Sequence, residues 1–238
     1  MCGVRDGLGS TAAARAEFAA RLLRPGMRVL DVGCGAGVIS RMLATSVPDV
    51  RVVGVDEVNR LGSARSIVDF VGGSVYALPL ADGAVDLAFA HGLFDHLRDP
   101  AAALAELHRV VRPGGRLALS TSDWSRAKLR PRTANVDAAL RGYYLLRRRQ
   151  GADPFAGKRL ADLVTAAGFA EVRSHARFRG DVAYRDLARQ VEAALAAALD
   201  TPSRDHQQLT SAARSAWVWS RAGDGEFNQC WVELTATR

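Results

Sequence analysis

The fold of this chain is decided by the stretch VLDVGCGAG at residues 29–37. Residues 28–32 are mostly apolar and β-branched, which predicts a short strand, and residues 38–44 have the apolar spacing of a helix. The three alternate glycines between them allow positive φ and have no Cβ, so the backbone of this turn can approach a ligand closely. The helix N-terminus adds unpaired N–H groups and a partial positive charge. Such a turn is typical of a site for the polar part of a nucleotide-like molecule.

Two acidic residues near the turn indicate more specifically which ligand it binds. The dinucleotide fingerprint Gly-x-Gly-x-x-Gly is not met, because Val38 stands where its last glycine would fall. Asp31 lies two residues before Gly33, and Asp56 ends a second predicted strand at 52–55. An acid about 20 residues beyond the turn can hold the hydroxyls of a ribose. The alternative is a chance acid on the second strand.

The bulk properties fit one α/β domain. The chain has 238 residues, of which 48% are hydrophobic and 24% charged, and no apolar run approaches the ~18 residues of a membrane span. The first residues lack an apolar signal core. Cys2, Cys34 and Cys230 are odd in number and widely spaced, which suggests neither a disulfide framework nor a metal site. We therefore expect a cytoplasmic protein with no metal and no membrane partner.

The positive charge has two interpretations. The formal net charge is +7 and comes almost entirely from arginine, because Lys128 and Lys158 are the only lysines. A polyanionic partner such as nucleic acid would suit this charge. The many alanines and arginines together indicate a GC-biased composition, which favours dispersed, solvated arginines. We therefore do not expect nucleic acid as the partner.

Five segments, in order, resemble the motifs of the class I methyltransferases, which use S-adenosylmethionine as cofactor. The segments are residues 29–37, 54–56, 77–79, 86–100 and 112–115. The resemblance is dense over about 25–120 and looser over 155–175. It is strongest to the small-molecule group of quinone and natural-product biosynthesis.

The resemblance implies a Rossmann-like α/β fold with a seven-stranded, mostly parallel sheet in the order 3-2-1-4-5-7-6 and an antiparallel last strand. It also implies a cofactor site formed by Asp31, Gly33, Cys34, Gly35, Gly37, Asp56, Glu57, Val58, Ser74, Val75 and His91. Ser74 departs from the family, which usually has an aspartate there. A carboxylate accepts hydrogen bonds from an adenine amino group better than a hydroxyl does, so adenine contacts at this position are in doubt.

Two histidines are candidates for a general base. Residues 86–90 predict a fourth strand, and open α/β sheets bind ligands outside the carboxyl ends of their strands. His91 stands at that end, and His96 matches a histidine common in the resembling family. Either imidazole could instead be structural and bonded to a backbone carbonyl. The segment lacks the metal-binding aspartate of catechol methyltransferases, so the resemblance implies no metal.

The chain beyond residue 121 contains more than the sheet requires. Long connections in compact domains tend to be functional, so we expect helical insertions that form a lid over the acceptor. The predicted single domain, 1–238, has a core at about 11–121, 155–178 and 227–237 and lid insertions at about 122–150 and 181–222.

The resemblance implies methyl transfer from S-adenosylmethionine to a small-molecule acceptor in secondary-metabolite or quinone-type biosynthesis. The cofactor carries the activation, so the protein mainly positions the reactants, and an oxygen acceptor can also require a general base such as histidine. Two alternatives stay open: an RNA methyltransferase, which the net charge suits, and a cofactor-binding domain without turnover, which Ser74 suits. A nicotinamide-dependent oxidoreductase is disfavoured by Val38 and by the order of the motifs. The acceptor atom and the oligomeric state stay open.

Overall fold

The computed structural model describes residues 10–57 and 67–238 and divides the chain into two compact units. The first unit comprises residues 1–121, 156–177 and 232–238, and the second comprises 122–155 and 178–231. The second unit includes both stretches that the sequence predicted as insertions. Their action as a lid stays a prediction. The short helix expected near residues 58–65 lies outside the described residues.

The strands form one mixed sheet in the order β3-β2-β1-β4-β5-β8-β6, with β7 paired to β8. Their bounds are β1 Arg28–Val32, β2 Arg51–Asp56, β3 Val68–Gly72, β4 Val85–His91, β5 Val111–Ser122, β6 Lys128–Arg130, β7 Ala170–Arg179 and β8 Glu226–Thr237. The pairings from β3 through β5 are parallel, and β6 pairs antiparallel with β8. The predicted α/β class and the order of its seven strands are confirmed.

The predicted number of strands was wrong by one. The sheet has eight strands, because residues 128–130 pair with β8 where the sequence suggested only a basic helical segment. Leu129 lies opposite Phe227 in this pairing and is buried, whereas its two neighbours are exposed. Three residues are too few for an alternating pattern to be recognised in the sequence.

The described residues contain seven α-helices. Their bounds are α1 Ser10–Ala20, α2 Val38–Ser46, α3 Pro100–Val110, α4 Ala134–Arg149, α5 Leu160–Ala166, α6 Tyr184–Ala197 and α7 His206–Ser220. Asp99 caps α3, since its carboxylate accepts a hydrogen bond from Ala102 N at 2.9 Å, and Pro100 occupies the first turn. None of the helices in the described ranges is long and apolar enough to cross a membrane.

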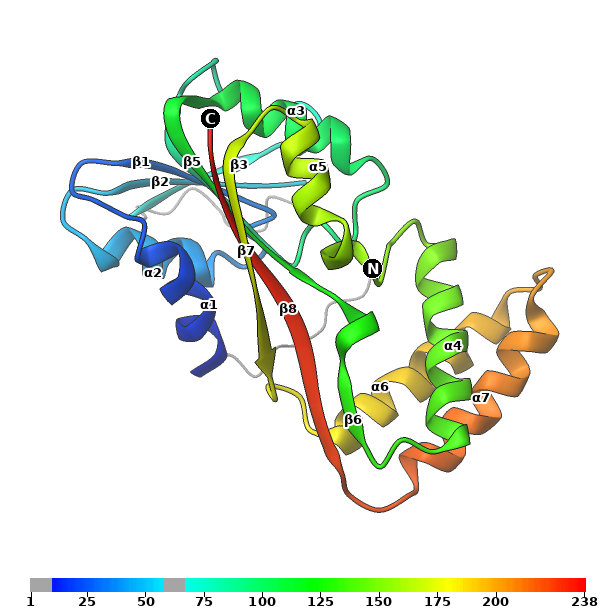
Figure 1. Cartoon of the computed structure of the whole chain (residues 1–238). Coiled ribbons are helices and arrows are strands. Elements are labelled where there is room, and N and C mark those ends of the chain that lie inside the picture. Colours follow the sequence, from blue (N-terminus) through cyan, green and yellow to red (C-terminus); the bar gives the residue numbers. More distant parts are fainter. Residues whose placement is uncertain (1–9, 58–66) are drawn as a thin grey trace. The chain divides into compact units, whose positions relative to one another are not determined.

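The first unit has helices on both faces of its sheet (Figure 1). Val29 of β1 belongs to the apolar cluster shared with α1 and α2, whereas its neighbour Leu30 belongs to the cluster shared with α3 and α5. Both residues are fully buried. A strand that is covered by helices on both faces has a continuous run of apolar residues in its sequence. This run made β1 recognisable from the sequence. This packing holds the start of the glycine turn at the carboxyl end of β1.

The second unit has an apolar cluster of its own, formed mainly by α4, α6 and α7. The helices α4 and α7 approach closely at Gly142, where an added Cβ would overlap the side chain of Ala212. A small residue at this crossing therefore lets the two helix backbones meet. Trp124, Tyr143 and Tyr144 pack against the same cluster and are half-buried.

Candidate functional site

The glycine turn has the backbone conformation that the sequence predicted. Gly33, Gly35 and Gly37 have φ values of +71°, +53° and +69°, in the left-handed region that glycine adopts without strain. Gly33 N donates a hydrogen bond to Val55 O at 2.8 Å, which fixes the turn to β2. Gly37 is the N-cap residue of α2. The unpaired N–H groups of that helix therefore begin directly after the turn.

Asp56 contacts the glycine turn directly. Its Oδ2 atom accepts a hydrogen bond from Gly35 N at 2.9 Å. The parallel pairing of β1 and β2 brings the two residues together, since Val32 lies opposite Val55 in the register. Asp56 and the glycine turn are separated in sequence but lie together at the carboxyl ends of adjacent strands. Open α/β sheets bind ligands at these ends.

A cleft of about 400 Å³ opens at these strand ends, within the usual range of small-molecule sites. Its lining residues are Val32, Gly33, Val55, Asp56, Glu57, Gly73, Val75, Tyr76, Leu93, His96, Leu97 and Arg98. Five of the predicted site residues are among them: Gly33, Asp56, Glu57, Val75 and His96. The cleft combines carboxylates at the end of β2 with apolar side chains from the segments after β3 and β4.

The other predicted residues within the described ranges are not among the lining residues of the cleft. Cys34, Gly35 and Gly37 belong to the turn, and Val58 lies outside the described residues. Ser74 Oγ donates a hydrogen bond to Glu57 Oε1 at 3.4 Å. The serine that replaces the family's aspartate is therefore within hydrogen-bond distance of a carboxylate that does line the cleft.

The two predicted histidines have different surroundings. His96 lines the cleft, its side chain is 54% exposed, and its Nε2 lies 3.8 Å from Asp95 Oδ2. His91 ends β4 opposite Ser120, and both of its ring nitrogens are buried. The structure thus brings His96, rather than His91, to the cleft surface.

Tyr76 is a lining residue that the sequence interpretation missed. Its hydroxyl accepts hydrogen bonds from Arg98 N at 3.2 Å and Asp99 N at 3.3 Å. It therefore links the loop after β3 to the segment that precedes α3. The available signal was an aromatic residue directly after the predicted Val75. Leu93, Leu97 and Arg98 were also missed, although they lie in the same segment as the two predicted histidines.

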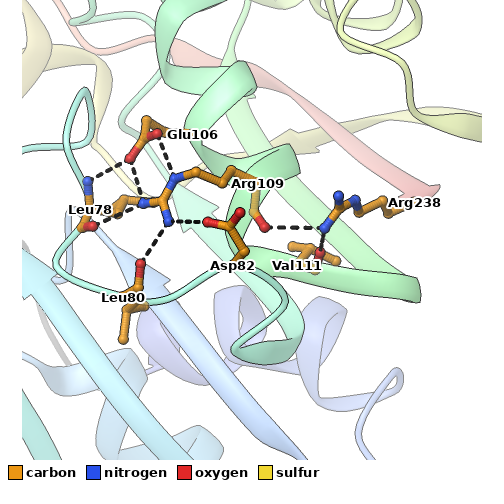
Figure 2. Close-up of polar contacts among 7 residues, drawn as sticks. All are labelled: Leu78, Leu80, Asp82, Glu106, Arg109, Val111 and Arg238. Carbon is orange, nitrogen blue, oxygen red and sulfur yellow. Dashed lines mark hydrogen bonds and ion pairs between the residues drawn. The ribbon is translucent and has the colours of Figure 1, made fainter.

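Arg109 of α3 holds the loop after β3 in place (Figure 2). Its guanidinium donates hydrogen bonds of 2.8 to 3.1 Å to the carboxylates of Glu106 and Asp82 and to the carbonyls of Leu78 and Leu80. Leu78 N donates to Glu106 Oε2 at 2.8 Å. The hydrogen bonds from Arg109 are the main cause of a lowered pKa at Glu106. The loop that lines the cleft is therefore fixed to a helix of the same unit.

Asp31 is a buried acid behind the glycine turn. It is 3% exposed, and its Oδ2 accepts a hydrogen bond from Ser40 Oγ at 2.6 Å. Burial raises the pKa of Asp31 to about 7; the bond from Ser40 opposes the rise and the charge of Asp56 adds to it. Burial also raises the pKa of the Cys34 thiol to about 12, so this thiol is protonated and is a poor nucleophile.

Asp31→Asn is expected to flatten the pH dependence of stability. The pKa of Asp31 is about 7 in the folded state against an ordinary 3.8, so the folded state binds the proton more tightly. The stabilisation of the folded state by this proton is complete below about pH 4. It is lost as pH rises through 7, with a slope in the free energy of unfolding of up to about 1.4 kcal/mol per pH unit. Asparagine keeps an acceptor for Ser40 but cannot ionise.

Urea unfolding at several pH values between about 4 and 8 measures this slope. The wild-type free energy of unfolding should fall more steeply with pH than that of the variant. Asp69→Asn, which changes an exposed acid on β3, is the matched control and should follow the wild type. Parallel curves for the wild type and Asp31→Asn would contradict the assignment.

Comparisons with known proteins place this fold and cleft in a family. Residues 30–119 match the family described as a methyltransferase domain. A demethylmenaquinone methyltransferase of Renibacterium salmoninarum is 30% identical over 168 residues, which are 68% of this chain and 68% of that protein. A malonyl-[acyl-carrier protein] O-methyltransferase of Methylococcus capsulatus is 35% identical over 162 residues, which are 64% of this chain and 55% of the relative.

A solved structure agrees in fold. The crystal structure of a putative methyltransferase from Bacillus halodurans matches this chain with a TM-score of 0.63 at 18% identity, over 96% of this chain and 99% of that one. With the motifs and the cleft, these findings define a class I fold for nucleotide-like cofactors. The chain belongs to the S-adenosylmethionine-dependent methyltransferases, which confirms the resemblance and the predicted cofactor. It spans 38%, 53% and 55% of the length of three curated relatives.

The residues of the cleft fit S-adenosylmethionine. A Cβ added at Gly35 would meet no atom of the described residues within 4 Å, so the protein leaves space beside the turn for a ligand. Asp56 and Glu57 offer carboxylates that suit the two ribose hydroxyls, and Val75 and Leu97 offer apolar surface that suits the adenine ring.

Proposed function

We propose that this protein transfers the methyl group of S-adenosylmethionine to a small-molecule acceptor in secondary-metabolite or quinone-type biosynthesis. The observation that carries the proposal is the cleft in which Asp56 meets the glycine turn, with His96 in the same lining. When bound, the cofactor supplies a methyl group already activated on a sulfonium. The protein then has to bind the two reactants, orient them and exclude water from the site.

Different residues of the chain would bind the cofactor, fix the lining loop and remove the proton. Asp56 and Glu57 would hold the ribose, the turn at Gly35 would hold the polar chain of the cofactor, and Arg109 would keep the lining loop in place. His96 would take the proton of an oxygen acceptor. Asp95 supports this role, since its buried carboxylate lies 3.8 Å from the imidazole, and a negative charge beside the ring stabilises the imidazolium that forms when the proton is taken.

The names of the relatives support a metabolite as the acceptor. Malonyl-[acyl-carrier protein] and demethylmenaquinone are different compounds, but neither is a nucleic acid. Described arginines also form ion pairs across the surface, for example Arg112 with Asp86, Arg132 with Asp137 and Arg221 with Glu192. These pairs support dispersed rather than focused positive charge.

Release of S-adenosylhomocysteine in a screen of hydroxylated aromatics, quinols and carboxylic acids tests the proposal. We expect release with at least one of these classes and none without an acceptor. Cofactor binding without release in any of them would favour a binding domain. Specific RNA affinity below about 10⁻⁷ M at physiological salt would favour an RNA methyltransferase, since nonspecific binding is typically about 10⁻⁴–10⁻⁶ M.

Asp56→Ala is expected to weaken S-adenosylmethionine binding about tenfold or more while the protein stays folded. Hydrogen bonds to a charged group contribute roughly 1.5–3 kcal/mol, and this carboxylate also fixes Gly35. Isothermal titration calorimetry measures the affinity. Asp162→Ala, which removes an exposed acid on α5, should leave it unchanged. An Asp56→Ala variant with wild-type affinity would reject the ribose assignment.

A further inference from the structure

The loop after β3, residues 73–84, forms one wall of the cleft but has few backbone hydrogen bonds to the rest of its unit. Gly73, Val75 and Tyr76 of this loop line the cleft. In the described part of the chain, the backbone of residues 74–82 bonds other backbone groups only within the loop, for example Ala77 N to Ser74 O at 3.1 Å. The position of this wall therefore depends on bonds from side chains.

The side chains of α3 hold the loop at Leu78 (Figure 2). Leu78 N donates a hydrogen bond to Glu106 Oε2 at 2.8 Å, and Leu78 O accepts one from Arg109 Nη2 at 3.1 Å. Arg109 Nη1 also donates to Leu80 O and to Asp82 Oδ1, each at 2.8 Å. Leu78 is 4% exposed, and buried backbone groups require partners. The pair formed by Glu106 and Arg109 thus satisfies both backbone polar groups of a buried loop residue.

The pair is itself fixed in place. Arg109 Nε and Nη2 donate to Glu106 Oε1 and Oε2, each at 2.8 Å, the bidentate geometry of strong charge-assisted bonds. The carbonyl of Arg109 accepts hydrogen bonds from Gly83 N at 3.0 Å and from Arg238 Nη1 at 3.1 Å (Figure 2). Both the side chain and the main chain of Arg109 are therefore held, so the loop is bonded to a fixed point at the end of α3.

We propose that Arg109 and Glu106 are positioning residues for the nucleoside half of S-adenosylmethionine. They hold the main chain at Leu78, and this contact keeps Val75 and Tyr76 in the arrangement that the nucleoside requires before it binds. Neither member of the pair is among the lining residues of the cleft, so the pair acts through the loop. This inference rests on the proposed function, whose cofactor site it deepens.

The pair lowers the cost of binding the cofactor. A loop that is already fixed in its bound conformation loses little conformational freedom when the ligand arrives, whereas a released loop has to be ordered at that moment. Removal of the pair therefore weakens the complex although every lining residue is kept. The loss falls on each ligand that contains the nucleoside, with or without the amino acid chain of the cofactor, because the glycine turn is not part of this loop.

The test is a calorimetric titration of the whole protein with S-adenosylhomocysteine and with adenosine. Arg109→Met keeps an apolar stem but removes every donor to the loop. We expect it to weaken both ligands about tenfold or more and by similar factors. Each titration is carried out well below the unfolding midpoint of the variant, where a protein that is merely less stable binds with unchanged affinity.

Two variants test whether the pair acts as one unit. Glu106→Gln replaces a carboxylate oxygen with an amide group that cannot accept a bond from Leu78 N or Arg109, and it should weaken both ligands. The double variant Glu106→Gln/Arg109→Met should bind about as weakly as Arg109→Met alone, since the two changes remove one shared contact. Arg109→Lys should restore only part of the affinity, because an ammonium keeps the charge but not the planar fork.

The matched control is Arg112→Met. Arg112 of β5 pairs with Asp86 of β4, so this change removes another guanidinium–carboxylate contact of the same unit. The side chains of Arg112 and Arg109 are 44% and 31% exposed, but only Arg109 bonds the loop after β3. Arg112→Met should therefore lower stability and leave both affinities unchanged.

Three outcomes would overturn the positioning role: wild-type affinities in both Arg109→Met and Glu106→Gln, equal losses in Arg109→Met and Arg112→Met, or a loss for S-adenosylhomocysteine without one for adenosine. If Arg109→Met does not fold, Arg109→Lys and Glu106→Gln carry the test. The titrations need neither an acceptor nor turnover. Failure to release S-adenosylhomocysteine with any acceptor would thus contradict the proposed function and leave the positioning role standing.

Discussion

Gly35→Val is expected to abolish binding of S-adenosylmethionine while the far-ultraviolet circular dichroism spectrum stays native. A Cβ at this position would enter space that the described protein atoms leave open, and a branched side chain would fill the place of the ligand. The backbone N–H of Gly35 also bonds the Asp56 carboxylate. We expect the affinity to fall about a hundredfold or more, because both steric exclusion and the loss of this geometry act on one site.

The control for this prediction has to reproduce the backbone strain. Gly35 has a φ of +53°, and a side chain in the left-handed region costs roughly 1–2 kcal/mol wherever it stands. Gly26 precedes β1, has a φ of +78° and would also meet no described atom within 4 Å of an added Cβ. Gly26→Val therefore carries comparable strain outside the cleft lining. It should lower stability but keep cofactor affinity, and normal binding by Gly35→Val would make the turn structural only.

Local patterns explain why much of the fold was predictable. The strand at 28–32, the alternate glycines and the following helix each depend on neighbours in sequence, and the parallel pairing of β1 with β2 follows from them. The sequence therefore predicts that Gly33 and Asp56 belong to one site. β6 has no such local signal, since its three residues become a strand only through pairing with β8.

The missed parts of the site depend on contacts distant in sequence. Arg109 bonds Leu80 across 29 residues and Asp82 across 27 residues, and no periodic pattern connects them. Tyr76 lines the cleft because its hydroxyl bonds the backbone before α3. Side chains that act through tertiary contacts are not specified by the local sequence.

His96→Ala is expected to lower kcat by roughly 10²–10⁴-fold, with cofactor affinity nearly unchanged, once an oxygen acceptor is known. The reason is its position: the imidazole lines the cleft and lies 3.8 Å from the buried carboxylate of Asp95. Asp95→Asn should reduce kcat less, because it removes only a negative charge beside the ring and leaves the base in place.

The control variant is His175→Ala, which removes an exposed imidazole on β7 and should leave kcat unchanged. His91→Ala has to be assayed beside His96→Ala, since His91 ends β4 and was the second candidate. A large fall in kcat for His91→Ala alone would transfer the role of base to that residue. If both variants keep more than about a third of the wild-type kcat, neither imidazole removes the proton. Catalysis then rests on proximity and orientation, which suffice when the acceptor is already nucleophilic.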